Sequence, residues 1–412
     1  MTTIALHPPL ARRLSRRTGF WAVAFSFLAL TAFSTAPSAL YGVYEQREQL
    51  SSLTLTVVYA VYSVGVIASL VLAGHVSDWY GRRAVLIPSL FVAAVAAVIF
   101  IASTSLTALL VARVLTGVAL GAAVATATAY IADLDAGPDG SVSRRAGIVA
   151  TAANIGGLAI GPLLAGLLTE YAAGGLTLPY VALLAALLVG AVGVVLSPEG
   201  HEPVRPRPSY RPQRLRAPAG ARSQFLAASA GGFLIFAVGG LFAGLAGAFL
   251  AGPLHHPSAA LTGVAILLNF GTGVLVQSTT TRWPASKLIR VGLPPTIIGL
   301  VILVASAWTT PASLALFLIG GAVTGTGGGA ILRASLTVVI STTTAADRAG
   351  ALATFFTAAY VGLALPVLGL GLGLQVLSPR VTLLVFGVVV GAGVLAAAPF
   401  LMRSGTEQRP SR

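Results

Sequence analysis

The fold expected for this chain is decided by the stretch Leu72-Ala73-Gly74-His75-Val76-Ser77-Asp78-Trp79-Tyr80-Gly81-Arg82-Arg83. Long apolar segments flank the stretch on both sides, and within it two glycines, one acid and two arginines make a short polar turn. A helix needs about 20 mostly apolar residues to cross a bilayer, and both flanking segments reach that length. The pattern therefore predicts a tight connection between two membrane-spanning helices.

The composition of the whole chain also indicates a membrane setting. Of the 412 residues, 56% are hydrophobic and only 9% are charged, whereas soluble domains carry about 25% charged residues. The chain has no cysteine, which excludes disulfides and thiol chemistry. Its five scattered histidines form no His-x-x-x-His pair, so we expect no metal centre and no cofactor.

Apolar segments long enough to span a bilayer recur along the chain and lack the alternating polarity of spanning strands. The predicted spans are 19–44, 52–76, 84–104, 106–132, 147–169, 179–196, 225–250, 259–280, 288–308, 311–339, 349–374 and 381–402. Backbone polar groups in lipid must bond within their own segment, which favours continuous helices. The fold class expected is an all-α membrane protein with twelve transmembrane helices.

The spans fall into two groups of six, separated by a polar stretch rich in proline and arginine. The expected domains are a tail 1–18, a bundle 19–196, a linker 197–224, a bundle 225–402 and a tail 403–412. The segment 145–151 closely matches the segment 348–354, and Gly117 and Gly121 align with Gly321 and Gly325 at nearly the same offset. This repeat predicts two bundles related by a pseudo-two-fold axis along the membrane normal.

The basic residues predict the orientation. Apart from Arg113 and Arg333, which lie inside spans, every Lys and Arg falls on the side of the N-terminus except Arg47 and Arg380. By the positive-inside rule, both termini are expected in the cytoplasm. The composition, rich in Ala, Gly, Val, Leu and Arg with one Lys, suggests a GC-rich bacterial genome, and the membrane expected is therefore a bacterial inner membrane. The net charge of +14 is then explained by topology and lipid contacts, not by nucleic acid, and we expect a monomer that binds a small-molecule substrate.

The pattern Gly-x-x-x-Asp-x-x-Gly-Arg-Arg resembles the signature loop between the second and third helices of the major facilitator superfamily. In that family the loop latches the cytoplasmic gate of the outward-facing state, and the resemblance implies the same for Gly74, Asp78, Gly81, Arg82 and Arg83. Gly74 is expected to permit close helix approach and Gly81 a tight turn. Asp78 is expected to accept hydrogen bonds at a helix N-terminus.

Arg82 has a candidate partner in Asp133, at the cytoplasmic end of the fourth span. The corresponding loop of the second half, 280–290, lacks the pattern. The resemblance covers roughly residues 19–402 and extends to two further motifs, in the fourth and fifth spans.

The fourth span contains Arg113, Gly117 and Gly121. Arg113 resembles the arginine of a family motif linked to proton coupling; an arginine snorkelling outward is the alternative. The two glycines, four residues apart, share a face and favour close packing.

The fifth span contains Gly157, Gly161, Pro162 and Gly166 and resembles the family's antiporter motif, with Ala165 in place of one glycine. Pro162 removes a backbone donor and allows a bend. Ordinary packing of small residues in membrane helices is the alternative.

The positions of the acidic residues differ from those in proton-driven exporters, which usually have an acidic residue near the central cavity. None of the eleven acids lies in the middle of a predicted span. We therefore hypothesise that Glu45 or Glu170 is the partner of Arg113 or a proton carrier. Other polar and aromatic side chains are candidates for the substrate cavity, although such residues more often pack or bond helices than contact a ligand: Ser34, Tyr59, Tyr62, Asn154, Asn269, Gln277, Arg333, Phe355, Phe356 and Tyr360.

The function expected is proton-coupled efflux of a drug or metabolite by rocker-switch alternating access, with the proton gradient as the energy source. No phosphate-binding loop of an ATP-driven pump is present, and nothing indicates an enzyme. Embedded Arg113 and Arg333 without embedded acids favour a second possibility, an importer or uniporter of small organic anions. A non-transporting receptor or scaffold is the third, and the intact gate motif argues against it.

Overall fold

The structure, a computed structural model, describes residues 13–74, 76–137, 141, 143–200, 210–344 and 347–404. Within these residues, 12 helices are long and apolar enough to cross a membrane. The first half contains α1 (Arg16–Thr35), α2 (Pro37–Glu48), α3 (Ser52–Ala73), α4 (Val76–Tyr80), α5 (Arg82–Ala102), α6 (Leu106–Asp135), α7 (Arg144–Tyr171) and α8 (Thr177–Leu196). The second half contains α9 (Arg222–Ala251), α10 (Ala259–Thr279), α11 (Ala285–Trp308), α12 (Leu314–Ser341), α13 (Arg348–Val376) and α14 (Pro379–Ser404). The fold class is confirmed.

Two details of the helices were not expected. The first span is divided into α1 and α2 at Ala36, because Pro37 has no N–H to donate and begins a new helix. The loop between the second and third spans contains the short helix α4. The repeated segments 145–151 and 348–354 lie, as predicted, at the starts of α7 and α13.

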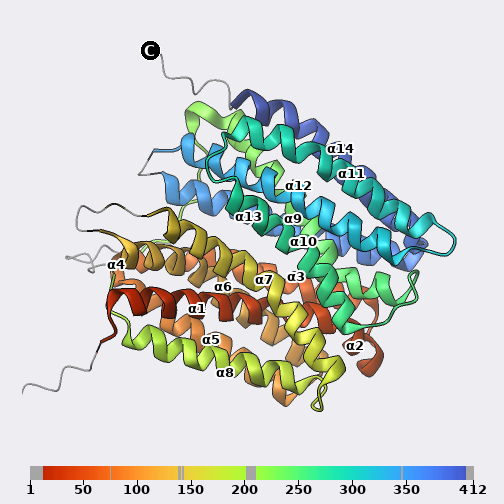
Figure 1. Cartoon of the computed structure of the whole chain (residues 1–412), viewed down its shortest axis with the longest axis horizontal. Helices are drawn as coiled ribbons and strands as arrows, with labels where there is room; N and C mark the ends of the chain where they lie inside the picture. The colour runs from red at the N-terminus through yellow and green to blue at the C-terminus, as the bar shows by residue number, and fades with distance from the viewer. Residues whose placement is uncertain are drawn as a thin grey trace, which may run out of the picture.

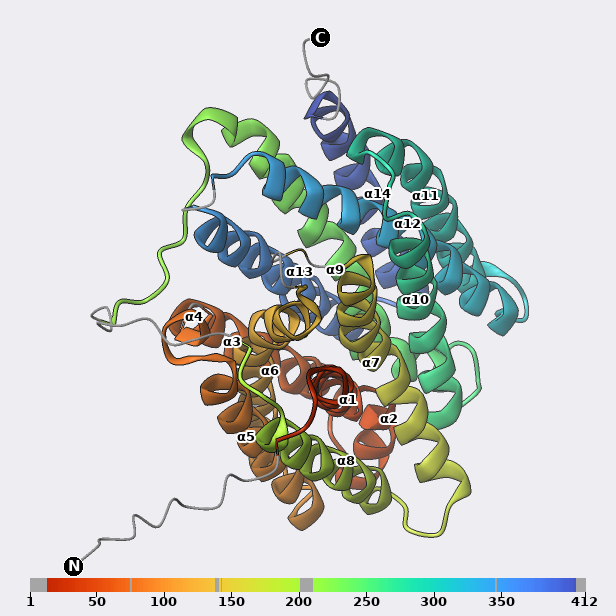
Figure 2. The ribbon, with the colours of Figure 1, turned by 60° about the vertical axis from the view of Figure 1, so that its left-hand side comes forward.

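The helices form two bundles that lie side by side, the first in warm and the second in cool colours (Figures 1 and 2). One end of the molecule, where α1, α5, α7 and α13 begin, contains most of the arginines, and we call it the arginine-rich end; it is at the left of Figure 1. The opposite end, where α6, α8, α10 and α12 begin, contains Arg47 and Arg380 and is the arginine-poor end.

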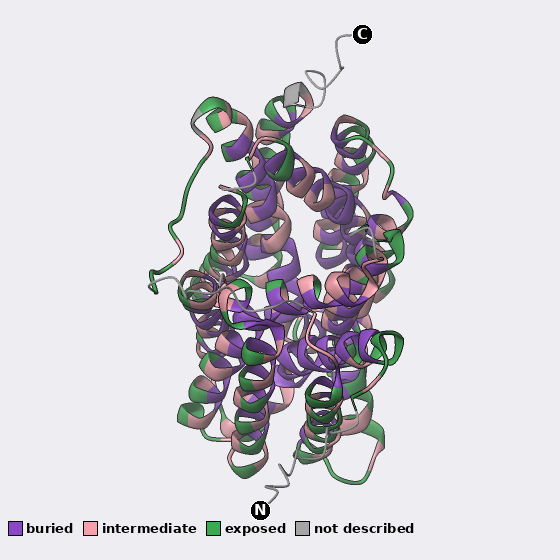
Figure 3. Ribbon diagram, turned by 90° about the vertical axis from the view of Figure 1, so that its left-hand side faces the viewer, coloured by how far each residue is buried: buried purple, intermediate pink, exposed green. Residues whose placement is uncertain are grey.

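Large apolar side chains cover the outside of both bundles. Phe91, Val189, Leu275, Val301 and Val389 are all exposed, while buried residues gather where the helices face one another (Figure 3). Few soluble proteins expose so much continuous apolar surface. The chain is therefore a multi-pass membrane protein, and its exposed apolar face contacts lipid.

Glycines set the closest helix contacts within each bundle. A Cβ on Gly121 of α6 would lie 2.6 Å from the carbonyl oxygen of Val66 in α3, and Gly65 and Gly117 meet at the same crossing. Their counterpart in the second half is the contact of Gly325 in α12 with Asn269 in α10. The close packing predicted for Gly117 and Gly121 is present, and the repeat extends from sequence to packing.

Candidate functional site

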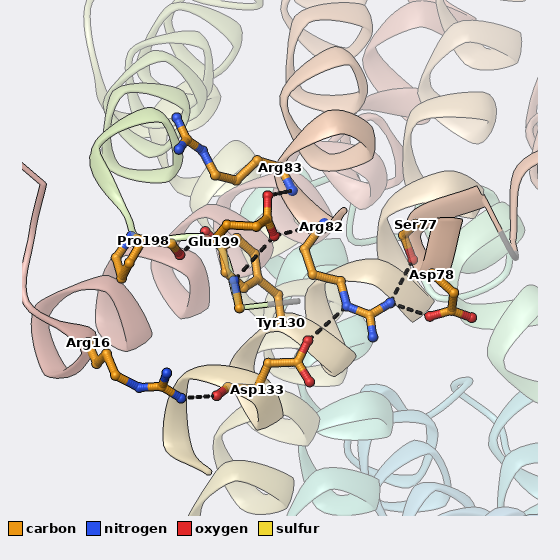
Figure 4. Close-up of polar contacts among 10 residues, drawn as sticks. Arg16, Ser77, Asp78, Arg82, Arg83, Tyr130, Asp133, Pro198 and Glu199 are labelled. Carbon is orange, nitrogen blue, oxygen red and sulfur yellow. Dashed lines mark hydrogen bonds and ion pairs between the residues drawn. The ribbon is translucent and has the colours of Figure 1, made fainter. Parts of the chain in front are cut away.

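Arg82 is the centre of a polar network at the arginine-rich end, which we call the gate network (Figure 4). Only 7% of the Arg82 surface is exposed. Its Nε donates to Oδ2 of Asp133 over 2.8 Å, and its Nη1 donates to Oγ of Ser77 over 3.0 Å and to Oδ1 of Asp78. The Arg82–Asp133 pair expected from the sequence is therefore present, and it joins the α4–α5 turn to the end of α6.

Asp78 does not lie where the sequence suggested. Its carboxylate, in α4, pairs with the side chain of Arg82 at the start of α5, because the turn at Gly81 brings the two side chains together. The carboxylate that caps a helix N-terminus is Glu199, which accepts from the backbone N–H of Arg82 over 2.9 Å and of Arg83 over 3.3 Å (Figure 4). Sequence reasoning missed Glu199; its position directly after the sixth span was the available signal.

The two glycines of the loop differ in role. Gly81 has φ of +95°, a conformation that favours glycine, and the Glu199 carboxylate lies against it. The prediction of a tight turn is confirmed. The prediction of close helix approach at Gly74 is wrong, because a Cβ there would meet only Leu70 of its own helix.

Arg113 of α6 is 1% exposed and lies about two turns from the arginine-poor end. Its Nη1 donates to the carbonyl oxygen of Ser34 over 2.7 Å. Its guanidinium carbon lies 4.5 Å from the ring centroid of Tyr62 and 5.7 Å from that of Tyr59. The arginine points inward, which excludes snorkelling, and a carbonyl and two aromatic faces are its neighbours.

The hypothesis that Glu45 or Glu170 pairs with Arg113 is not supported by this geometry, and we correct it. Oε1 of Glu45 accepts from Oγ of Ser52 over 2.6 Å. Oε2 of Glu170 accepts from Oγ of Ser258 over 2.6 Å and from the backbone N–H of Ala260 over 2.9 Å. In the described part of the chain, Arg113 forms no ion pair with any carboxylate.

Glu170 has a different place, at the interface between the halves. It projects from the end of α7 and caps the N-terminus of α10, where helix amides and the dipole favour an anion. Gly166, one turn earlier, packs directly on Ala259 of the same helix. These contacts close the arginine-poor end of the interface.

Two further glycines of the α7 motif pack within the first half, whereas the carbonyl oxygen of Pro162 lies against Gly263 of α10. Gly157 and Gly161 lie against Thr31 and Ala32 of α1. Pro162 leaves the carbonyl oxygen of Leu158, four residues earlier, without its helical donor. The hydroxyl of Thr35 in α1 donates to that oxygen over 3.2 Å, so a neighbouring helix replaces the hydrogen bond that the proline removes.

An aromatic cluster joins the halves at mid-depth. The rings of Tyr62 in α3 and Tyr360 in α13 lie 6.3 Å apart, and Phe236 of α9 lies 5.5 Å from Tyr360. Tyr41 of α2 lies 6.4 Å from Tyr59. Together with Arg113 these side chains form the aromatic–arginine cluster, which draws on five helices. Tyr41 and Phe236 were missed by sequence reasoning.

The other cavity candidates make contacts of their own. Asn269 donates to the carbonyl oxygen of Gly321 and bonds Thr324, so it joins α10 to α12. Arg333 donates to the carbonyl oxygens of Gln277 and Thr281, each over 2.9 Å, at the end of α10. Phe355 is buried against Gly232 and packs edge-on to Phe356. Asn154 is half-buried in α7.

Comparison with known families identifies the chain. The Major Facilitator Superfamily model matches residues 19–314. The chain therefore belongs to the major facilitator superfamily, and it is a transporter by family.

Two relatives match over shorter segments. The Bacillibactin exporter of Bacillus subtilis (strain 168) is 33% identical over 132 residues, 31% of this chain and 33% of that protein. An uncharacterized transporter of Buchnera aphidicola subsp. Schizaphis graminum (strain Sg) is 36% identical over 121 residues, 29% of this chain and 28% of that protein. The matches thus span about a third of the length of these relatives.

Solved transporter structures share the whole fold. A peptide transporter, POT, bound to alafosfalin has a TM-score of 0.73 at 14% identity, covering 94% of this chain and 95% of that one. A human organic anion transporter has a TM-score of 0.68 at 16% identity, covering 96% and 100%. The nucleoside transporter NupG has a TM-score of 0.66 at 12% identity, covering 94% and 99%. At these identities the likeness concerns the fold alone.

Proposed function

We propose that this protein exports a drug or metabolite across a bacterial inner membrane by proton-coupled alternating access. The observation that supports this most directly is the asymmetry of the interface between the halves. Contacts of Gly166 with Ala259 and of Glu170 with Ala260 close the arginine-poor end. The gate network around Arg82 lies at the other end, within the first half.

In the orientation we propose, the arginine-rich end and both termini face the cytoplasm. The structure then corresponds to an inward-facing state. In the outward-facing state the arginine-rich end closes, and Asp78, whose side chain is 58% exposed here, contacts the second half. The protein acts as a monomer, with a small-molecule substrate and membrane lipids as its partners.

The test of export is a growth-inhibition panel in a pump-deficient bacterial host. The intact chain is expected to protect against at least one compound, and Arg113→Ala is expected to lose that protection. Arg47→Ala is the matched control, because Arg47 is an exposed arginine at the same end of the molecule. Protein amounts in the membrane must be equal for all three chains. Protection by Arg113→Ala equal to that of the intact chain would remove this residue from the mechanism.

Proton coupling is tested in proteoliposomes with a compound from the panel. Transport is expected to rise when a pH gradient is imposed and to fall when an ionophore collapses it. Transport that is indifferent to the gradient would contradict antiport and favour a uniporter.

A second candidate is an importer or uniporter of small organic anions, and Arg113 favours it. A buried guanidinium without a carboxylate partner is costly, and its Nε has no hydrogen-bond partner. A substrate carboxylate would supply the missing charge. Uptake of benzoate, compared with uncharged benzamide, separates this candidate from export of neutral or cationic compounds.

A further inference from the structure

The helices α3 and α13 run side by side across the interface between the halves, and their separation changes along their length. Near the arginine-poor end they touch: a Cβ on Gly371 would lie 3.1 Å from Cβ of Thr56. At mid-depth the rings of Tyr62 and Tyr360 meet, with centroids 6.3 Å apart.

At the arginine-rich end the linker lies between these two helices. Its Gln213 N–H donates to the carbonyl oxygen of Val71 in α3 over 2.7 Å, and the hydroxyl of Tyr210 donates to the carbonyl oxygen of Leu72 over 2.9 Å. Both acceptors belong to the last turn of α3, whose final carbonyl groups have no partner within the helix. This part of the linker thus caps the first half.

The next residues of the linker contact the start of α13 in the second half. The carbonyl oxygen of Arg214 would lie 2.7 Å from a Cβ on Gly350. Thr354 donates to the carbonyl oxygen of Arg216 over 3.1 Å, and Nη1 of Arg216 lies 3.0 Å from Oδ1 of Asp347. Figure 2 shows the light green chain before α9 crossing from the first half to the second.

Gln213 contacts both helices at once. Its backbone N–H bonds α3, and its side-chain Nε2 would lie 3.3 Å from a Cβ on Gly350 of α13. One extended chain occupies about 5 Å between its neighbours. Hence α3 and α13 are unable to meet at this level while the linker stays in place.

We propose that residues 210–216 are a removable wedge that holds the arginine-rich end open. The proposal rests on the alternating access proposed above and adds a regulatory element to it. The wedge is held by hydrogen bonds to backbone carbonyl oxygens at its edges and by an exposed ion pair, Arg216–Asp347, and exposed pairs contribute little. Closure of the arginine-rich end requires its release, so ligands or lipids that bind the linker would shift the transport cycle.

Distance measurements between pairs of spin labels test this, since the natural chain has no cysteine to remove. One pair, Arg17→Cys with Arg290→Cys, reports the arginine-rich end; another, Thr177→Cys with Val376→Cys, reports the arginine-poor end. Arg17 and Arg290 lie at the arginine-rich end, and Thr177 and Val376 lie at the arginine-poor end. All four residues are exposed. The protein is the full chain in lipid nanodiscs.

Two independent variants release the wedge. Arg216→Asp replaces the ion pair with repulsion, and Gln213→Pro removes the N–H that bonds Val71. Each is expected to shorten the distances at the arginine-rich end by about 5 Å, the thickness of the chain that leaves, and to lengthen those at the arginine-poor end. Adding Asp347→Arg to Arg216→Asp should restore the distances of the unmodified chain. Arg211→Asp, which makes the same change of charge in the same segment, should leave them unaltered.

A further variant, Gly371→Leu, separates failure of the wedge from failure of alternating access. It forces α3 and α13 apart at the arginine-poor end without touching the linker. If Gly371→Leu changes both distances while Arg216→Asp and Gln213→Pro change neither, the wedge is overturned and alternating access stands. If no variant, Gly371→Leu included, moves either pair, the halves do not rock, and both proposals fail.

Discussion

The two ends of the interface between the halves are built differently. At the arginine-poor end, Gly166 packs on the backbone of Ala259, Gly371 packs on the side chain of Thr56, and Glu170 caps a helix of the opposite half. At the arginine-rich end, an ion-pair network stays within the first half and a polar linker separates α3 from α13. Contacts at the arginine-poor end depend on close packing of small residues. Contacts at the arginine-rich end depend on charges and on a linker segment that can move out from between α3 and α13.

This difference indicates how one fold supports two states. Glycine contacts have no long side chains to reorder, so two surfaces of this kind can separate and meet again as rigid bodies. Charged side chains at the other end can change partners in contact with water.

Gly371→Leu is expected to have the largest effect. A leucine does not fit between α13 and Thr56, so the arginine-poor end will not close and transport should be lost. Gly369→Leu is the matched control, because no atom lies within 4 Å of a Cβ at that position. The measurement is protection in the growth panel, with membrane amounts quantified. Equal protection by the two variants would contradict closure at this contact.

Arg82→Ala should destabilise the first half. It leaves the carboxylate of Asp133 without its partner, which we expect to cost about 2 kcal/mol, less than for a fully buried pair because both acids are partly exposed. Thermal unfolding in detergent measures this. Arg47→Ala, which removes the exposed Arg47–Glu48 pair, should change the midpoint very little. A similar midpoint for both variants would show that the gate network contributes no stability.

Glu170→Gln should weaken the closed arginine-poor end while leaving each half intact. The charge that favours the N-terminus of α10 is lost, an effect of about 0.5–1 kcal/mol. Spin labels at Thr177→Cys and Val376→Cys should then report a larger open fraction. Glu45→Gln, whose bond to Ser52 lies within the first half, is the control. An unchanged distribution in Glu170→Gln would exclude a closing role for this residue.

Thr35→Val should have the smallest effect. It removes the hydroxyl that donates to Leu158, the carbonyl left without a donor by Pro162, and should cost about 1 kcal/mol. Thr128→Val is the control, since that hydroxyl bonds only the carbonyl of Val124 in its own helix. Thermal unfolding that does not separate the two variants would mean that Leu158 finds another donor.

Sequence reasoning succeeded where the physical rule is local. Spans follow from apolar length, and the Arg82–Asp133 pair follows from the loop motif and the end of the fourth span. Sequence reasoning failed where the partner of a side chain depends on how helices rotate or on where the linker lies. Glu170 faces a helix N-terminus of the other half and not Arg113, and Glu199 and Gln213 contact helices far from them in sequence. Only the assembled fold brings such residues together.

The most direct test of the central claim, that the halves separate and meet at the arginine-poor end, is a reversible cross-link. Thr56→Cys with Gly371→Cys places two thiols whose Cβ atoms lie 3.1 Å apart, slightly closer than the roughly 3.8 Å of a disulfide. We predict that oxidation forms the bond readily and abolishes transport of a panel compound in proteoliposomes, and that a reductant restores it. Full transport by the cross-linked protein would contradict the account.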